Sequence, residues 1–121
     1  MLERLPPDRE LIEFFGAEPD VLDAGVPWLY NQVTFVTERE SDRLVFTLAP
    51  AYGELKVIWS CGGADVVSAE LSGLRTLEVD TLQPPSPSLI VKDGGGTQLR
   101  LWLEPRVRLF LAHREPPAGG D

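Results

Sequence analysis

The stretch from Gln98 to His113, QLRLWLEPRVRLFLAH, decides the fold class of this chain. It consists of two segments of alternating apolar and polar residues, joined at Glu104-Pro105. Successive side chains of a β-strand point to opposite faces, so the alternation predicts two strands with one face against a hydrophobic core. The residues predicted to lie on that inner face are Leu99, Leu101, Leu103, Val107, Leu109 and Leu111.

The outer face of the same two strands combines aromatic and basic residues. Tryptophan and arginine are enriched among the residues that dominate binding energy in protein interfaces, because each buries a large area and offers a hydrogen-bond donor. We therefore predict a partner-binding surface formed by Arg100, Trp102, Arg108 and Phe110. The alternative is that this face packs under a helix or against a second sheet. The aromatic residues in Trp28–Tyr30 and at Tyr52 leave the same two interpretations open.

Further short strands are predicted upstream of this stretch. They lie in the segments Val33–Thr37, Leu44–Leu48, Leu55–Cys61, Asp65–Leu71, Leu74–Asp80 and Leu89–Lys92. About eight short strands at roughly 8–12-residue spacing, most of them joined by short turns, are typical of an antiparallel β-sandwich or open barrel. The fold class is therefore mainly β.

One short helix is predicted from Arg9 to Phe15, where it would cover one end or edge of the sheet. Asp8 is expected to cap its first turn, and Gly16 to supply the left-handed residue after its last turn. With 121 residues, the chain is expected to form a single domain. We predict an N-terminal arm over residues 1–7, a folded core over 8–113 and a disordered tail over 114–121.

Acidic residues outnumber basic ones by 19 to 11, which gives a net charge of −8 and a pI near 4.6. A phosphate backbone or an anionic membrane would be repelled by this charge, so nucleic acid and membrane are poor partners, whereas a basic protein is a natural complement. The alternative is that the charge only maintains solubility. We interpret the polar cluster Glu38–Asp42 as a hairpin loop, and we predict that Glu38, Glu40 and Asp42 steer a basic partner.

The residues that could support catalysis or metal binding are few. His113 is the sole histidine and is expected to end the last strand, while Cys61, the sole cysteine, alternates in phase with core residues. One His and one Cys do not make a zinc site, and Asp93–Gly96 lacks the ending of a phosphate loop. We therefore predict no enzyme activity, no cofactor and no metal.

The compartment is predicted from three features. A lone cysteine cannot form an intramolecular disulfide, which suits a reducing environment. The N-terminal residues do not form the basic and apolar pattern of a signal peptide, and no apolar run approaches the roughly 18 residues of a membrane span. We expect a cytoplasmic protein.

The N-terminal part of the chain resembles a family of bacterial immunity proteins from polymorphic toxin systems. The resemblance rests on Phe15-Gly16, Pro19 and Asp23-Ala24 before the first strand, and it continues in Leu71–Val79 and Leu89–Val91. It implies a cytoplasmic, non-catalytic protein that neutralises a cognate toxin by covering its active or substrate-binding surface. Two other classes stay open from the residues alone. They are a small-ligand-binding or enzymatic β-barrel, and a structural subunit that oligomerises through an exposed strand edge or its apolar face.

Overall fold

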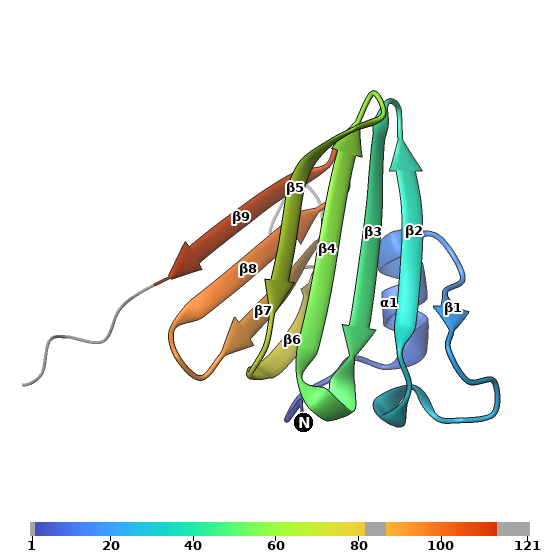
Figure 1. Ribbon diagram of the computed structural model, residues 1–121, viewed down its shortest axis with the longest axis vertical. Coiled ribbons are helices and arrows are strands. Elements are labelled where there is room, and N and C mark those ends of the chain that lie inside the picture. Colours follow the sequence, from blue (N-terminus) through green and yellow to red (C-terminus); the bar gives the residue numbers. More distant parts are fainter. Residues whose placement is uncertain (1, 82–86, 114–121) are drawn as a thin grey trace, which may run out of the picture.

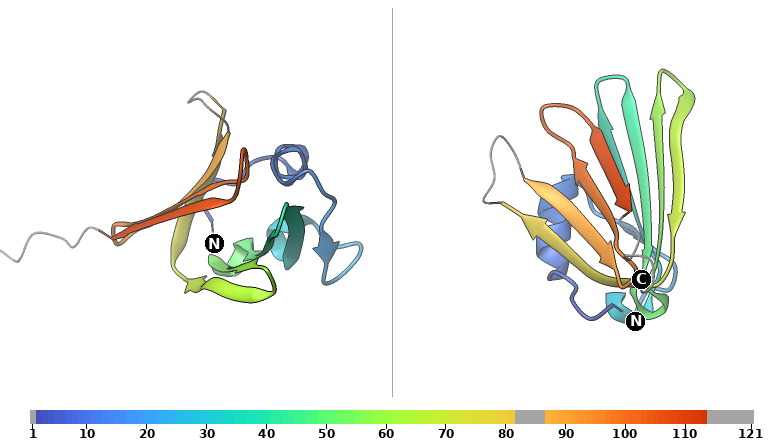
Figure 2. Two further views of the ribbon diagram at one scale, coloured as in Figure 1. Left: turned by 90° about the horizontal axis from the view of Figure 1, so that it is seen from above. Right: turned by 90° about the vertical axis from the view of Figure 1, so that its left-hand side faces the viewer.

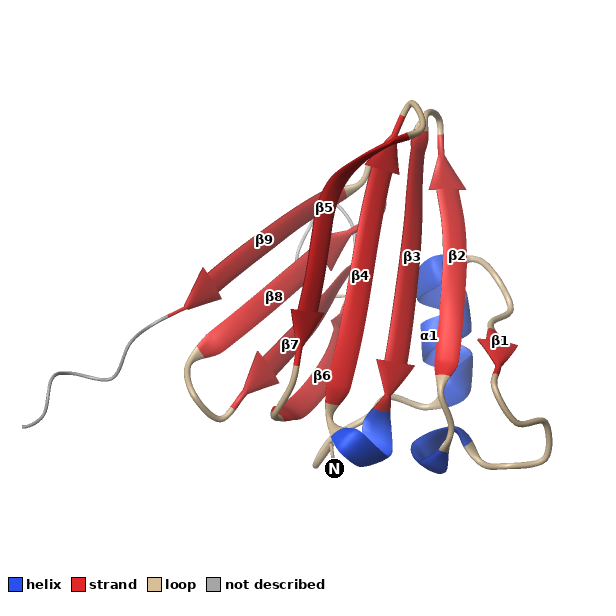
Figure 3. Cartoon of the chain, in the orientation of Figure 1, coloured by secondary structure: helices blue, strands red, loops and turns tan. Residues whose placement is uncertain are grey.

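The computed structural model describes residues 2–81 and 87–113. Nine strands in two sheets and one short α-helix make up this part of the chain, which confirms the predicted β-rich class as a sandwich (Figures 1 and 3). The elements are α1 Asp8–Phe15, β1 Asp20–Val21, η1 Trp28–Tyr30, β2 Val33–Arg39, β3 Asp42–Ala49, η2 Pro50–Tyr52, β4 Glu54–Cys61, β5 Ala64–Leu71, β6 Leu74–Asp80, β7 Ser88–Asp93, β8 Thr97–Trp102 and β9 Arg108–His113. The predicted tail over 114–121 lies outside the described residues.

Both sheets are antiparallel, and each follows the order of the chain. The first sheet has the order β1-β2-β3-β4-β5, and the second has the order β6-β7-β8-β9. Figure 1 shows the strands of the second sheet running obliquely behind those of the first. Tight turns join most neighbouring strands, as the turn residues predict, and β2, β3 and β8 alternate between buried and more exposed residues. Each sheet therefore buries one face against the other and leaves one face outward.

The core lies between the two inner faces. From the first sheet it contains Phe35, Phe46 and their neighbours, and from the second it contains Leu99 and Leu101, all almost fully buried. Leu103, just after β8, is buried with them. The phenyl ring of Phe15 stacks on that of Phe35 with centroids 4.4 Å apart, and its centroid lies 5.0 Å from that of Phe46. Helix α1 is thereby fixed against the inner face of the first sheet, and it also contacts β6. Figure 2 shows the helix end-on, at the side of the sandwich where β1 lies.

The helix begins and ends in different ways. Gly16 adopts the predicted left-handed conformation, with φ 68°, and its N–H bonds to the carbonyl of Ile12. The predicted cap at Asp8 is wrong: Asp8 is already helical, Pro7 occupies the capping position, and no side chain caps this end among the described residues. The carbonyl of Pro7 accepts the first backbone bonds of the helix, from the N–H groups of Glu10 at 3.0 Å and Leu11 at 3.4 Å. At the other end, Thr37 Oγ1 donates to the carbonyl of Phe15 at 3.1 Å.

The N-terminal arm is attached to the edge of the second sheet. Arg4 forms a parallel bridge with Thr76, and the N–H of Leu77 donates to the carbonyl of Arg4 at 2.9 Å. Leu2 is buried with the core, and its N–H bonds to the carbonyl of Pro50 in η2, which joins β3 and β4 of the first sheet. The arm thus covers the edge of β6 and connects the two sheets at one end of the sandwich.

The hairpin between β2 and β3 is tighter than the sequence indicated. The strands pair as far as Arg39 and Asp42, so only Glu40 and Ser41 form the turn, with Glu40 at φ 57°. Asp42 is 4% exposed and accepts a hydrogen bond from Trp59 Nε1 at 3.0 Å. The predicted five-residue loop was therefore too long, because Arg39 and Asp42 still pair as strand residues and Asp42 bonds to Trp59 on β4.

The inner face of the stretch Gln98–His113 is buried as predicted, with one clear exception. Leu99, Leu101, Leu103 and Val107 are buried, as their alternation predicted, but Leu111 is 50% exposed. Leu111 pairs with the buried Leu99, so it does lie on the inner face. Its exposure follows from its place on β9, because β9 is the edge strand of the second sheet and has a neighbour on one side only.

Candidate functional site

The four residues predicted to bind a partner lie together on the outer face of the second sheet. Trp102 pairs directly across the ladder with Arg108, and Arg100 pairs with Phe110. We call this group the Trp102 patch. Cross-strand neighbours have Cβ atoms about 5 Å apart, so the four side chains form one contiguous surface.

Within the Trp102 patch, the two arginines are engaged by other groups of the chain. The guanidinium carbon of Arg100 lies 5.2 Å from the centroid of the Trp102 ring, and that of Arg108 lies 4.9 Å from it. Arg100 also forms an ion pair with Asp80 at 3.1 Å. Both contacts to the ring are within the range of a cation–π interaction. The indole is therefore half-buried beside two cations, whereas Phe110 is 55% exposed.

The three predicted acidic residues do not lie on this face. Glu38 is on the outer face of the first sheet, where it faces Arg43 across the ladder with 3.8 Å between the charged groups. Glu40 is exposed at the tip of the turn, whereas Asp42 is buried. An ion pair of 2.7 Å between Arg39 and Glu104 joins this hairpin to the connection after β8. The hairpin and the Trp102 end of β8 thus lie at the same end of the sandwich, on different sheets.

His113 and Cys61 lie at the ends of strands, His113 at the end of β9 and Cys61 at the end of β4. His113 is exposed, and its Nδ1 lies 2.7 Å from Thr97 Oγ1, its cross-strand partner. Cys61 is half-buried at the end of β4, with its sulfur 3.9 Å from Ser41 Oγ. Among the described residues, no group of three or more His, Cys, Asp or Glu side chains is placed to hold a metal ion. In the same part of the chain, no helix is long and apolar enough to cross a membrane.

The glycine-rich segment after β7 is a turn held by Asp93. Its carboxylate accepts hydrogen bonds of 2.8 Å from the backbone N–H groups of Gly95 and Thr97. These bonds favour the charged form, so the pKa of Asp93 lies below its ordinary value. The Thr97 N–H lowers it most, partial desolvation opposes this, and the Gly95 N–H lowers it further. This carboxylate organises the hairpin between β7 and β8.

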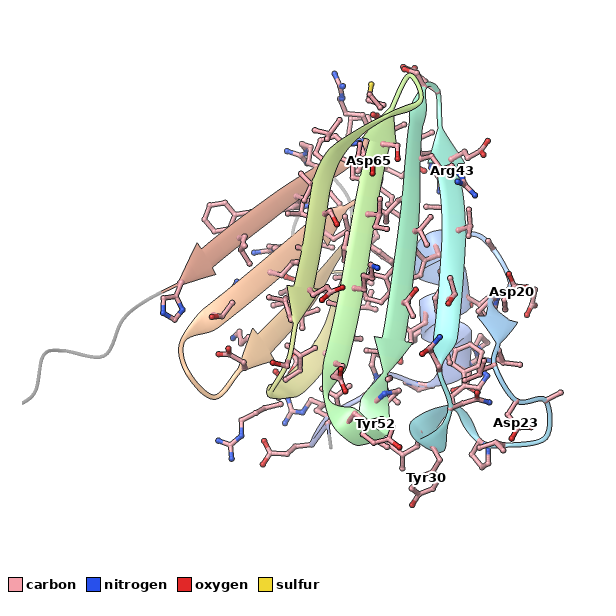
Figure 4. The ribbon with its side chains drawn as sticks, viewed as in Figure 1. Asp20, Asp23, Tyr30, Arg43, Tyr52 and Asp65 are labelled. Carbon is pink, nitrogen blue, oxygen red and sulfur yellow. The ribbon has the colours of Figure 1, made fainter. Side chains whose placement is uncertain are left out.

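The structure also contains a groove that the sequence did not predict as a site. The groove has a volume of about 1040 Å³ and lies on the outer face of the first sheet. Its floor includes Thr47 and Lys56, which alternate with buried residues of β3 and β4, and its walls come from the segment after β1 and from η2. Figure 4 shows Asp23, Tyr30 and Tyr52 together at this end of the sheet.

One wall of the groove is fixed by a buried asparagine. The Asn31 side-chain oxygen accepts from the N–H groups of Asp23 and Gln32, at 3.1 and 2.9 Å. Its amide nitrogen donates to the carbonyls of Asp23 and Val26, at 2.7 and 3.0 Å. Asn31 thereby satisfies the backbone of a segment with little regular structure. The wall is held in place before any ligand arrives.

The rim of the groove exposes aromatic and acidic side chains. Tyr30 is 62% exposed and Tyr52 75% exposed, and the two short helices that carry them lie against each other. The charged residues that line the groove are Asp23, Glu54, Glu70 and Lys56. Lys56 is paired with Glu70 at 3.6 Å, and the carboxylates of Asp23 and Glu54 have no partner among the described residues. The groove is therefore acidic, with two tyrosines at its mouth.

Sequence patterns indicated the tyrosines but not their grouping. Trp28–Tyr30 and Tyr52 interrupt the strand alternation, and each stands in a short segment with neighbouring proline or glycine. Such connecting segments run over the surface of a protein and often carry binding residues. Tyr30 and Tyr52 come together because η1 and η2, about twenty residues apart in the chain, pack against each other. The alternation of apolar and polar residues along a strand carries no information about such packing.

These features define an antiparallel two-sheet sandwich with one helix against the inner face of the first sheet. No family model matches the chain, and no curated protein matches it. The fold is shared with a chain of a solved structure described as a contact-dependent growth inhibition toxin–immunity protein complex from Klebsiella pneumoniae 342. The TM-score is 0.76 at 10% sequence identity, and the match covers 92% of this chain and 96% of that chain. At this identity the similarity shows a common fold.

Proposed function

We propose that this protein is an immunity protein that binds and neutralises a cognate bacterial toxin in the cytoplasm. The observation that carries the proposal is the fold shared with a chain of a toxin–immunity protein complex over nearly the full length of both chains. The resemblance of Phe15–Ala24 to the immunity family points in the same direction from the sequence. The two indications are independent, since one is a local sequence pattern and the other a global arrangement of strands.

A toxin and an immunity protein are both named for the matched structure, and the charge of this chain favours the immunity role. The net charge is −8, and exposed acids such as Glu18, Asp20 and Glu40 have no ion-pair partner among the described residues. A toxin that acts on nucleic acid would need a cationic surface, and an acidic protein complements such a surface. The only histidine, His113, forms a hydrogen bond with Thr97 at the end of β9, and it does not line the groove.

The mechanism that we propose is occlusion. Exposed carboxylates raise the rate of encounter with a basic partner, and a few aromatic side chains supply most of the affinity once the two surfaces meet. The Trp102 patch, with Glu38 and Glu40 near the same end of the sandwich, is one candidate contact surface. Asp42 is not available to a partner in the same way, since its carboxylate is buried against Trp59.

Co-expression with the product of the neighbouring open reading frame tests the function. We expect that product to arrest growth when expressed alone, and this protein to restore growth and to co-purify with it as a stable complex. Trp102→Ala should weaken the complex by about tenfold or more if the Trp102 patch is the contact, because truncation of an interface tryptophan commonly costs about 2 kcal/mol or more. Growth arrest by this protein itself, or absence of a complex, contradicts the proposal.

A further inference from the structure

We propose that the groove on the outer face of the first sheet receives an arginine-bearing segment of the toxin. The identity of the partner rests on the proposed function, and the chemistry of the occupant rests on the groove itself. The groove is separate from the Trp102 patch, which lies on the outer face of the other sheet. Its shape, its charge and its aromatic rim each lead to the same occupant.

The shape of the groove suits a short peptide segment. Its volume of about 1040 Å³ is at the upper end of the range found for small-molecule sites, so there is space for more than one side chain. The floor is a twisted sheet surface, and the wall from Asp23 to Asn31 is held by the four hydrogen bonds of the Asn31 side chain. Because this wall is already ordered, binding loses less conformational entropy than it would if the wall became ordered only on binding.

The charge of the groove selects a cation. Lys56 and Glu70 neutralise each other at one end, whereas Asp23 and Glu54 are exposed without a partner among the described residues. Two uncompensated carboxylates in one concave surface create a negative potential that a cationic side chain relieves. A phosphate or a carboxylate ligand would be repelled from the same place.

The tyrosines distinguish arginine from lysine. Tyr30 and Tyr52 are largely exposed, and they line the same groove as the two uncompensated carboxylates, at the end of the sheet where Figure 4 labels Asp23, Tyr30 and Tyr52. A guanidinium group is planar, stacks on an aromatic face and donates hydrogen bonds in its own plane. It can therefore contact a tyrosine ring and a carboxylate at the same time. An ammonium group lacks the plane and is more strongly hydrated.

The first test uses a hexa-arginine peptide and the full-length protein. Backbone amide chemical shifts in an NMR titration should move for the segments that line the groove, 22–32, 52–56 and 70–72, and not for α1 or β9. A hexalysine peptide should bind several-fold more weakly. Asp23→Asn with Glu54→Gln should weaken binding of hexa-arginine by about tenfold, since two exposed ion pairs with the peptide are lost.

A matched control removes two carboxylates elsewhere. Glu13→Gln with Glu18→Gln changes the net charge by the same amount, at exposed positions on and just after α1. We expect this variant to bind hexa-arginine within about twofold of the wild type, because screening at physiological salt limits the effect of distant charges. Tyr52→Ala should weaken binding by about threefold, the effect expected of one exposed cation–π contact.

Several results would overturn the proposal. They are shifts centred on α1 or on the Trp102 patch, an equal loss of affinity in the control variant, equal binding of hexalysine, and no detectable binding of hexa-arginine. A metabolite that binds the groove in preference to the peptide would also overturn it, and would favour a small-ligand function instead.

Failure of this proposal can be separated from failure of the proposed function. If co-expression rescues growth and the Asp23→Asn/Glu54→Gln variant rescues as well as the wild type, the groove is not the contact and the immunity function stands. If hexa-arginine occupies the groove but the wild type neither binds nor neutralises the neighbouring gene product, the immunity function fails and the cation site stands.

Discussion

Substitution of Asp42 separates a structural role from a binding role. The carboxylate is 4% exposed and accepts the indole N–H of Trp59 at 3.0 Å, so Asp42→Ala leaves that donor without its partner. Loss of a hydrogen bond to a charged group costs about 1.5–3 kcal/mol, and water can reach the half-buried indole, so we expect about 1–2 kcal/mol of lost stability. Asp42→Asn keeps an acceptor oxygen in the same place and should lose less than half as much.

Urea denaturation followed by far-ultraviolet circular dichroism measures this effect. With a slope near 1.5 kcal/mol per molar urea, which is typical of a domain of this size, the midpoint for Asp42→Ala should fall by roughly 1 M. Glu40→Gln, at the exposed tip of the same hairpin, is the control and should leave the midpoint within about 0.3 M of the wild type. An unchanged midpoint for Asp42→Ala together with weaker toxin binding would refute the reasoning, because it would place the carboxylate against the partner.

Three further predictions concern stability. Phe15→Ala should cost about 3–5 kcal/mol of unfolding free energy in the same urea assay, because it removes a fully buried ring that contacts Phe35 and Phe46. A loss below about 1.5 kcal/mol would mean that α1 is not docked in this way. Gly53→Ala should cost about 1–3 kcal/mol by thermal denaturation, because φ is 63° and the added Cβ would lie 3.0 Å from the Leu74 carbonyl oxygen. Asp93→Asn should be less stable than the wild type near neutral pH. The difference should shrink as the pH falls below about 4, because a carboxylate with a lowered pKa stabilises the fold only while it is charged. A stability difference that does not change with pH would contradict the role of the charge.

Strand alternation predicted much of the fold because it reports a local constraint. Leu99, Leu101 and Leu103 share a face in any regular strand, and the hydrophobic effect favours burial of a face that carries three leucines. Gly16 was predictable for the same reason, since a glycine after an apolar helical segment commonly ends the helix. In each case the deciding physics acts within a few residues along the chain.

The remaining features depend on contacts between segments. The burial of Asp42 follows from the position of Trp59 on the next strand, and the exposure of Leu111 follows from the absence of a tenth strand beside β9 among the described residues. The groove requires the segment after β1, η2 and the strands β3 to β5 to meet at one end of a sheet. The pattern of residues along the chain does not indicate which strand forms the edge of a sheet or which turns lie side by side. The residue types of the Trp102 patch were visible in the sequence, but the engagement of Arg100 by Asp80 was not.

The two candidate surfaces cannot both be the centre of one ordinary interface. The Trp102 patch and the groove lie on the outer faces of different sheets, and these faces point away from each other across the core. A standard interface covers about 800 Å² of one partner, roughly a ninth of the 7237 Å² accessible surface of this protein, so it spans one face of such a sandwich. Residues that dominate affinity cluster near the middle of an interface. A toxin that loses affinity with Trp102→Ala should therefore be insensitive to Asp23→Asn/Glu54→Gln, and the reverse should also hold. Equal loss in both variants, each with an unchanged urea midpoint, would require two separate contacts and a toxin that wraps around the end of the sandwich.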